Sequence, residues 1–389
     1  MADKRVLGSS VDLMAALRKK VLRLDGAMGT QIQRFTLTEE DFRRGVFLDT
    51  AVPLKGDNEC LNLTRPDVIA AVHEAYIAAG ADIIETNTFS ANRISQKEYG
   101  LEAHARDMAL AGARIARAAA DKAPRTVWVA GSIGPTSKSL TLAPDIARPA
   151  ERPYSFDEMA ASYREQVEAL LEGGVDLLLI ETAFDALNVK AALYAVETRF
   201  LDSACGSARN DNKKTARNDQ EKTARNNQEK SARNDQEKTA RNDQEKSARN
   251  DGEPFPVIVS VSVGDKSGRT LTGQTLEAFF TAVRHYPLAA FGVNCSLGAD
   301  GLLPLVKDIA SFSDVPVICY PNAGLPNELG GYDQTPAQMA AEMARFDGFL
   351  NIAGGCCGTT PDHIRAIPAL SPAPVKETRK ELKVSGLEA

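Results

Sequence analysis

Cysteines form the most chemically suggestive pattern in this sequence. Cys295 follows the apolar run AAFGVN, and the adjacent pair Cys356 and Cys357 lies between glycines directly after another apolar run. Three converging thiolates would form a zinc site with one coordination position left open. A substrate thiol bound at that position would lose its proton, and the thiolate is the nucleophilic form of sulfur. The pattern therefore indicates a metal centre that activates a sulfur nucleophile.

The spacing of these cysteines leaves other interpretations open. Sixty residues separate Cys295 from Cys356, and the sequence contains no CxxC motif. Vicinal cysteines between glycines could instead be small residues packed in a tight turn, or a redox pair. Cys319 lies inside an apolar run and is predicted to be a buried side chain with no role in chemistry. Six cysteines in 389 residues are too sparse for a disulfide scaffold.

Acidic residues stand at the ends of three apolar runs. Asp25, Glu85 and Glu181 each close such a run. A buried carboxylate is costly unless it is paired, so this placement favours a cationic ligand, such as the ammonium group of an amino acid. The alternative is that the carboxylates accept hydrogen bonds from backbone amides in the strand-end loops. Gly131, near the end of another run, is expected to let the backbone approach a ligand or turn tightly.

The elements that must position these residues are eight short apolar runs, each followed by an amphipathic stretch. Near-continuous apolar strands that alternate with helices predict a parallel sheet buried on both faces, and eight such units predict a single (β/α)8 TIM barrel. An open doubly wound sheet is the alternative, but the first turn reads DGAMGTQ and not GxGxxG. The candidate residues all fall at C-terminal strand ends, where barrel enzymes build their active sites. The eight runs are 21–25, 82–86, 127–132, 176–182, 256–263, 289–294, 315–320 and 348–354.

One segment is foreign to this pattern. Residues 207–252 repeat an octapeptide of the type KTARNDQE, which contains no large apolar residue and cannot bury a core. We predict a disordered insert in an αβ loop on the bottom face, away from the site, where a long loop is tolerated. The predicted organisation is therefore a barrel from 1–206 and 253–370, the insert, and a linker-like tail from 371–389.

Composition excludes several classes of protein. A net charge of −6 gives no indication of a nucleic-acid partner or an anionic membrane surface. No apolar run approaches the ~20 residues of a membrane helix, and the first residues lack the apolar core of a signal peptide. A cytoplasmic location is the resulting expectation.

Long stretches of the sequence resemble the N-terminal homocysteine-binding module of cobalamin-dependent methionine synthase, a member of the zinc-dependent homocysteine S-methyltransferases. The resemblance extends over the whole chain outside 207–252. The matching stretches are LDGAMGTQIQ (24–33), GADIIETNTFSAN (80–92), GSIGPTSKSLTLAPD (131–145), LLLIETAFDALNVKAAL (177–193), SGRTLTGQT (267–275), FGVNCSLGAD (291–300), YPNAGLPNELGGYD (320–333) and NIAGGCCGTTPDHI (351–364).

This resemblance implies a set of roles. The zinc ligands, which would act catalytically through the metal, map onto Cys295, Cys356 and Cys357. Asp25 and Glu181 are expected near the amino group of L-homocysteine. The full set of expected substrate-binding residues is Asp25, Gly26, Glu85, Asn87, Gly131, Ser132, Glu181 and Asn294.

The resemblance also implies a reaction and its partners. The homocysteine thiolate on zinc would attack the methyl group of methylcobalamin, giving methionine and cob(I)alamin. The folate-binding and cobalamin-binding modules of the synthase have no counterpart here, so we expect corrinoid and folate modules to act in trans. Two alternatives remain: a homocysteine methyltransferase that uses S-methylmethionine or betaine, and a non-catalytic homocysteine-binding subunit of a split synthase.

Overall fold

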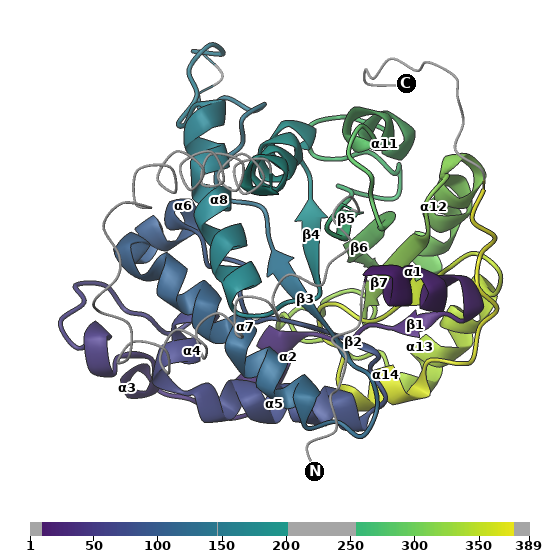
Figure 1. Ribbon diagram of the computed structural model, residues 1–389, viewed down its shortest axis with the longest axis horizontal. Helices are drawn as coiled ribbons and strands as arrows, with labels where there is room; N and C mark the ends of the chain where they lie inside the picture. The colour runs from purple at the N-terminus through teal and green to yellow at the C-terminus, as the bar shows by residue number, and fades with distance from the viewer. Residues whose placement is uncertain (1–9, 146, 201–253, 377–389) are drawn as a thin grey trace, which may run out of the picture. The chain divides into compact units, whose positions relative to one another are not determined.

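The computed structural model describes residues 10–145, 147–200 and 254–376. The chain divides into two units, Met1–Ala195 with Phe255–Ala389, and Val196–Pro254. The first unit contains the barrel (Figure 1). The predicted insert of 207–252 lies outside the described residues, as does the predicted tail from residue 377 onward.

Eight parallel strands form a single sheet, as the apolar runs predict. Its order is β1-β8-β7-β6-β5-β4-β3-β2. The edge strands also meet, because Leu24 bridges Ile83 in parallel and the Asp82 amide donates to the Arg23 carbonyl at 2.7 Å. This contact closes the sheet and confirms the (β/α)8 barrel. The strands are β1 (Leu22–Arg23), β2 (Ile83–Glu85), β3 (Trp128–Ile133), β4 (Leu177–Ala183), β5 (Val257–Val261), β6 (Ala290–Gly298), β7 (Val317–Asn322) and β8 (Ile352–Ala353).

Helices surround the barrel (Figure 1), and their ends carry ordinary start signals. At the start of α8, Ser155 accepts a hydrogen bond from the Glu158 amide, and the Glu158 carboxylate accepts one from the Ser155 amide in return. The longer described helices are α1 (Ser10–Lys19), α5 (Pro66–Ala78), α7 (Ala105–Asp121), α8 (Phe156–Glu172), α11 (Leu276–Val283), α12 (Ala299–Phe312) and α13 (Pro336–Met343), with a further helical segment at 186–200. The shorter ones are α2 (Met28–Gln33), α3 (Glu39–Phe42), α4 (Leu61–Thr64), α6 (Arg93–Gln96) and α14 (Pro361–Ala366).

Large apolar side chains fill the interior of the barrel. Leu22, Leu179, Ile258 and Ile352 come from four different strands and are fully or almost fully buried in one core cluster. Burying such a side chain stabilises the fold by roughly 1.5–3 kcal/mol. Because both faces of each strand are covered, the strands read as continuous apolar runs and not as alternating ones. This core packs inside the barrel and so fixes the positions of the C-terminal strand ends.

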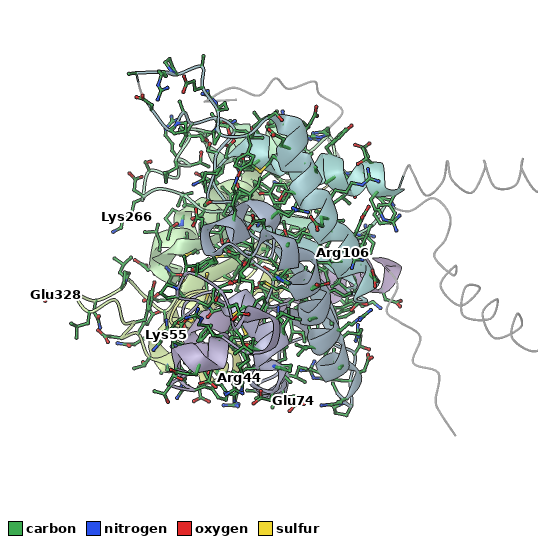
Figure 2. All side chains as sticks on the ribbon, turned by 90° about the vertical axis from the view of Figure 1, so that its left-hand side faces the viewer. Arg44, Lys55, Glu74, Arg106, Lys266 and Glu328 are labelled. Atoms are coloured by element: carbon green, nitrogen blue, oxygen red, sulfur yellow. The ribbon has the colours of Figure 1, made fainter. Side chains whose placement is uncertain are left out.

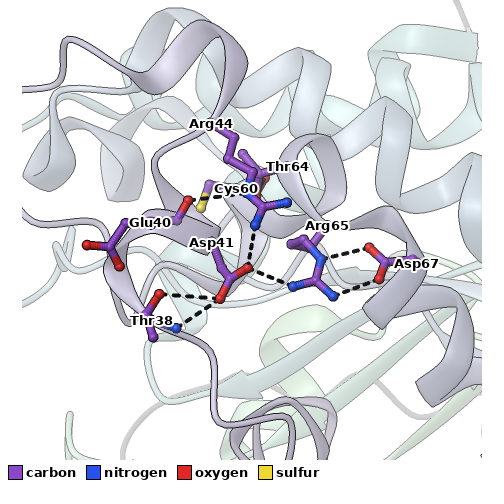
Figure 3. A network of polar contacts seen from close by, with 8 residues as sticks. All are labelled: Thr38, Glu40, Asp41, Arg44, Cys60, Thr64, Arg65 and Asp67. Carbon is purple, nitrogen blue, oxygen red and sulfur yellow. Dashed lines mark hydrogen bonds and ion pairs between the residues drawn. The ribbon is translucent and has the colours of Figure 1, made fainter.

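The long connection from β1 to α5 is fixed by a polar network (Figure 3). The Asp41 carboxylate accepts hydrogen bonds from the Thr38 amide at 3.0 Å, from Arg44 at 2.8 Å and from Arg65 at 2.7 Å. Arg65 also donates to both carboxylate oxygens of Asp67, at 2.9 and 2.7 Å. This network ties α3 to the first turn of α5 and so orders a loop that borders the mouth of the barrel.

The loops that follow the strands stand on one side of the unit. In Figure 2, Lys266 and Glu328, from the loops after β5 and β7, project at the left-hand edge. This side carries the C-terminal strand ends and is the mouth of the barrel. Among the helices that the structure describes, none combines the length and apolarity needed to cross a membrane.

Candidate metal and substrate site at the mouth of the barrel

Three cysteine sulfurs converge at the mouth. Cys295 comes from the C-terminal part of β6, and Cys356 and Cys357 come from the loop after β8. Their Sγ atoms all lie within 4.8 Å of one another, and those of Cys295 and Cys357 are 3.8 Å apart. The loop is fixed to β7 because the Cys356 amide donates to the Pro321 carbonyl at 2.7 Å. Residues separated by sixty positions in the sequence therefore form one cluster of thiols.

The cluster fits a tetrahedral metal ion. A metal with bonds of ~2.3 Å to sulfur places neighbouring sulfurs about 3.8 Å apart, which matches the Cys295–Cys357 separation. The thiols of Cys356 and Cys357 donate to the Cys295 sulfur and lower its pKa. The hydrogen bond to Cys295 is the largest cause that raises the pKa of Cys356 and of Cys357, and repulsion from the charge on Cys295 raises both further. A cation would relieve this repulsion, so the three residues could hold a metal ion.

The backbone around Cys295 is strained in a way that aims its side chain. Cys295 and Ser296 have φ values of 60° and 61°, a left-handed conformation that is rare outside glycine, and the pairing of β6 with β7 shifts register between Asn294 and Gly298. Thr182, at the end of β4, is also left-handed, with φ of 53°. Each such residue costs of order 1–3 kcal/mol and persists only where the surroundings impose it.

Asn294 links these strained positions to the thiols. Its Oδ1 accepts hydrogen bonds from the Thr182 amide at 3.0 Å and from the Ser260 hydroxyl at 2.7 Å. Its Nδ2 donates to the Thr182 hydroxyl at 2.8 Å and reaches the Cys356 sulfur at 3.8 Å. Asn294 therefore joins the ends of β4, β5 and β6 to the loop that carries Cys356.

Three acidic side chains lie buried or partly buried at the mouth, near the thiols. Asp25 and Glu181 are only 2% and 5% exposed, and Glu85 is partly buried. The Glu85 amide donates to Asp25 Oδ2 at 3.1 Å. Within the described part of the chain, Asp25 Oδ1 and Glu85 Oε1 are buried and have no hydrogen-bond partner. Unpartnered buried oxygens of this kind point to a ligand that donates hydrogen bonds.

Burial raises the pKa of all three acids. The pKa of Asp25 and that of Glu85 lie well above their usual range, and mutual repulsion among the acids raises them further. Burial raises the pKa of Glu181 to about 7, against the lowering effect of hydrogen bonds from Ser132 and Tyr320. A bound cation would favour the ionised form of every member of this group.

Glu181 is held by two hydroxyl groups. The Ser132 hydroxyl donates to its Oε1, and the Tyr320 hydroxyl donates to its Oε2 at 3.3 Å. The Ser132 amide in turn donates to the Thr86 hydroxyl at 3.0 Å. Sequence reasoning missed Tyr320, whose only signal is its position directly before the Pro-Asn pair that ends β7.

Other predicted residues lie at the mouth but have their own structural contacts. The Asn87 amide group turns toward the preceding connection and donates to the Asn58 carbonyl at 2.8 Å and to Asn62 Oδ1 at 3.0 Å. At Gly26, an added Cβ would lie 2.7 Å from the Thr359 hydroxyl, so the chain passes too closely for a side chain. At Gly131, a Cβ would lie 3.1 Å from Leu170 of α8. Gly131 therefore allows close packing of strand against helix.

Cys319 is fully buried within β7, as predicted from its place inside an apolar run. Its pKa is raised by burial, which keeps the thiol neutral.

Comparison with known proteins identifies the family and the fold. The chain matches the family model for homocysteine S-methyltransferase over residues 22–370. Its fold is similar to that of the homocysteine methyltransferase MmuM from Escherichia coli in the oxidised form, with 21% identity and a TM-score of 0.61, covering 91% of this chain and 98% of that one. The metallated form of the same protein gives 22% identity and a TM-score of 0.58, with 90% and 96% covered. Because the family match extends over most of the sequence, the chain belongs to the homocysteine S-methyltransferase family and is a methyltransferase.

Proposed function

We propose that this protein binds L-homocysteine and a zinc ion at the mouth of the barrel and transfers a methyl group to the homocysteine sulfur. The observation that carries the proposal is the placement of three converging thiols beside three buried carboxyl groups. The first group suits a soft metal ion, and the second suits the ammonium group of an amino acid. Homocysteine carries both a thiol and an ammonium group, so it complements both halves of the site.

Cys295, Cys356 and Cys357 would hold the metal. Zinc bound there would lower the pKa of the homocysteine thiol and keep its thiolate in place. Asn294 orients the loop of Cys356, and the strained backbone at Cys295 directs the third sulfur toward the other two. The chain itself therefore sets the geometry of the ligands.

The carboxyl groups would bind the substrate ammonium. Asp25, Glu85 and Glu181 offer oxygens at a buried position, and the hydroxyls of Ser132 and Tyr320 fix the Glu181 carboxylate. Glu181 is also adjacent in sequence to Thr182, which contacts Asn294, so the carboxylate and sulfur halves are continuous. This continuity supports a single amino acid spanning both.

We propose methylcobalamin, carried on a separate corrinoid module, as the methyl donor. The homocysteine sulfur forms the new bond to the methyl carbon, and the cobalt–carbon bond breaks with both electrons remaining on cobalt. The products are methionine and cob(I)alamin. The proton of the thiol departs before this step, so the step itself needs no general acid or base. Support comes from the resemblance of 320–333 and 291–300 to methionine synthase. A folate-binding partner in trans would return a methyl group to cob(I)alamin.

A free small donor, S-methylmethionine or betaine, is the second candidate. It is favoured by the fold similarity to a homocysteine methyltransferase whose chain is covered over 98% of its length. Incubation of the zinc-loaded protein with homocysteine and each donor in turn, followed by mass spectrometry of methionine, separates the candidates. We expect methionine to form with methylcobalamin, together with an equal amount of cob(I)alamin. Formation only with a small donor would identify the second candidate, and no methionine with any donor would refute the proposed reaction.

A further inference from the structure

Two buried acids lie outside the site, next to the loop that follows β2. They are Asp57 and Glu59, which flank Asn58 in the connection between β1 and α5, and they lie beside Gln96 of α6. Their side chains are almost completely buried, with Asp57 2%, Glu59 7% and Gln96 0% exposed. Buried acids that take no part in binding metal or substrate need another explanation.

Three hydrogen bonds join these residues, with the neighbouring Asn58, to the loop after β2. The Glu59 carboxyl accepts a hydrogen bond from the Ser90 amide at 2.8 Å. Gln96 Nε2 donates to the Ser90 carbonyl at 3.2 Å and to Asp57 Oδ1 at 3.0 Å. Between the two acids, the Asn58 carbonyl accepts a hydrogen bond from Asn87 at 2.8 Å. The segment 57–59 is therefore hydrogen-bonded to the loop at both Asn87 and Ser90.

The two carboxyl groups also lie within hydrogen-bonding reach of each other. Asp57 Oδ2 is buried and has no donor partner among the described residues. Two carboxylates this close would repel each other, so the contact is favourable only when one proton lies between them. The nearby titratable groups are Cys60 and Tyr99, with Glu39 and Glu98 acting on these in turn, and none of the four supplies a positive charge.

We propose that the Asp57–Glu59 pair, sharing one proton, is a positioning device that holds the 86–92 loop, and with it Glu85 and Asn87, in the geometry that binds homocysteine. The link to homocysteine rests on the proposed function, whereas the link to the loop rests on the contacts alone. Asp57 and Glu59 touch no substrate and act only through the loop.

The pair should also set an alkaline limit for substrate binding. Burial, followed by repulsion from Asp57, raises the pKa of Glu59 to about 8. Below that pH the two acids share a proton, and the hydrogen bond between Glu59 and the Ser90 amide is intact. Above it the pair carries two negative charges, so repulsion between the carboxylates would loosen the loop.

The experiment compares Glu59→Ala, Glu59→Gln and the control Glu98→Gln, which removes an exposed carboxylate from the same region. The readouts are the KM for homocysteine, kcat, the zinc content and amide hydrogen exchange over 86–92 in the substrate-free protein. For Glu59→Ala we expect about a tenfold rise in KM, from loss of one buried hydrogen bond to an acid, with faster exchange over 86–92 and unchanged zinc content.

Glu59→Gln should restore both the neutral-pH KM and the slow exchange, because its amide oxygen can accept from Ser90 while its NH2 group donates to Asp57. In the parent protein, the KM for homocysteine should rise above pH 8 more than the titration of homocysteine itself explains. In Glu59→Gln this additional rise should be absent. The ratio of wild-type KM to variant KM, measured from pH 6 to 9.5, isolates this effect because the substrate titrates identically in both.

Two results would overturn the proposal. One is unchanged amide exchange over 86–92 in Glu59→Ala. The other is a ratio of wild-type KM to Glu59→Gln KM that stays constant from pH 6 to 9.5. If the parent protein makes no methionine at all, the proposed function fails. The exchange measurement would still test whether Glu59 holds the 86–92 loop in place.

Discussion

The sulfur half and the carboxylate half of the barrel mouth are built in opposite ways. On the sulfur side, the Cys295 and Cys357 sulfurs contact each other, Asn294 contacts Cys356, and left-handed backbone fixes Cys295. On the carboxylate side, Asp25 and Glu85 each leave a buried oxygen without a partner within the described residues. The chain therefore holds the thiols through contacts of its own, whereas two of the three carboxyl groups keep a buried oxygen that only a ligand could satisfy.

This difference predicts how metal binding and substrate binding depend on each other. Because the chain alone positions the thiols, metal binding should need no substrate. Because the carboxyl groups repel one another, that half should reach its lowest free energy only when a cation is bound. Changes in one half should accordingly affect one readout and leave the other intact.

The largest effect is expected from Cys356→Ala. Removing one of three sulfur ligands should abolish both the bound zinc, about one per chain in the parent, and methyl transfer. Metal analysis by mass spectrometry and the methionine assay measure the two losses. Cys319→Ala is the matched control. Cys319 lies in β7 between Ile318 and Tyr320, whose side chains belong to the barrel core, so its own side chain points to the opposite face of the strand. This variant should keep both zinc and turnover. Full zinc content in Cys356→Ala would contradict the assignment of the sulfur half.

A smaller and separable effect is expected from Glu181→Gln. The neutral amide keeps the size of the side chain but removes the charge proposed to bind the ammonium group. We expect the KM for homocysteine to rise roughly 10²-fold, since loss of one member of a buried charge pair costs about 2–5 kcal/mol. Zinc content should stay at the parent value. Glu74→Gln, which removes an exposed surface carboxylate, should change neither quantity. Loss of zinc in Glu181→Gln would show that the two halves are not independent.

The smallest effect concerns the pH dependence of stability in the absence of homocysteine. The pKa of Glu181 is raised from its usual value near 4.5 to about 7, so the folded state binds the proton more tightly than the unfolded chain. Stability should therefore fall as the pH rises from about 4.5 through about 7.

A thermal-melting comparison of the zinc-loaded protein checks this sign. The Tm should be lower at pH 8 than at pH 6, by about 2–5 °C for a chain of this size, and saturating homocysteine should reduce the difference. A Tm that rises over this interval would mean that the carboxylate half is not destabilised by its own charge.

The fold followed from the sequence to an unusual degree. All eight apolar runs correspond to strands, because strands covered on both faces must be apolar at nearly every position. The runs mark strand centres better than strand ends. Within the run predicted at 348–354, only Ile352–Ala353 forms strand β8. Strand β6 extends past its predicted end to Gly298, through the register shift near Cys295.

The candidate site was less completely predictable. Residue type and strand-end position identified the three cysteines and three carboxyl groups. They did not identify Tyr320, because a tyrosine at the end of an apolar run reads as part of the core. Nor did they reveal that the Asn87 amide group faces Asn58 and Asn62. These contacts join segments that approach each other only when the barrel closes.

The sequence by itself determined the parallel barrel and which residue types stand at its mouth, because hydrophobic pattern and strand-end position are local properties of the chain. Only the tertiary structure decided which of them meet: the bulge that turns Cys295 toward Cys356 and Cys357, the hydroxyls that hold Glu181, and the contact between Asp57 and Glu59. The physical reason is that sulfur–metal geometry and carboxyl–carboxyl repulsion depend on separations of a few ångströms, which closure of the barrel sets and sequence spacing does not.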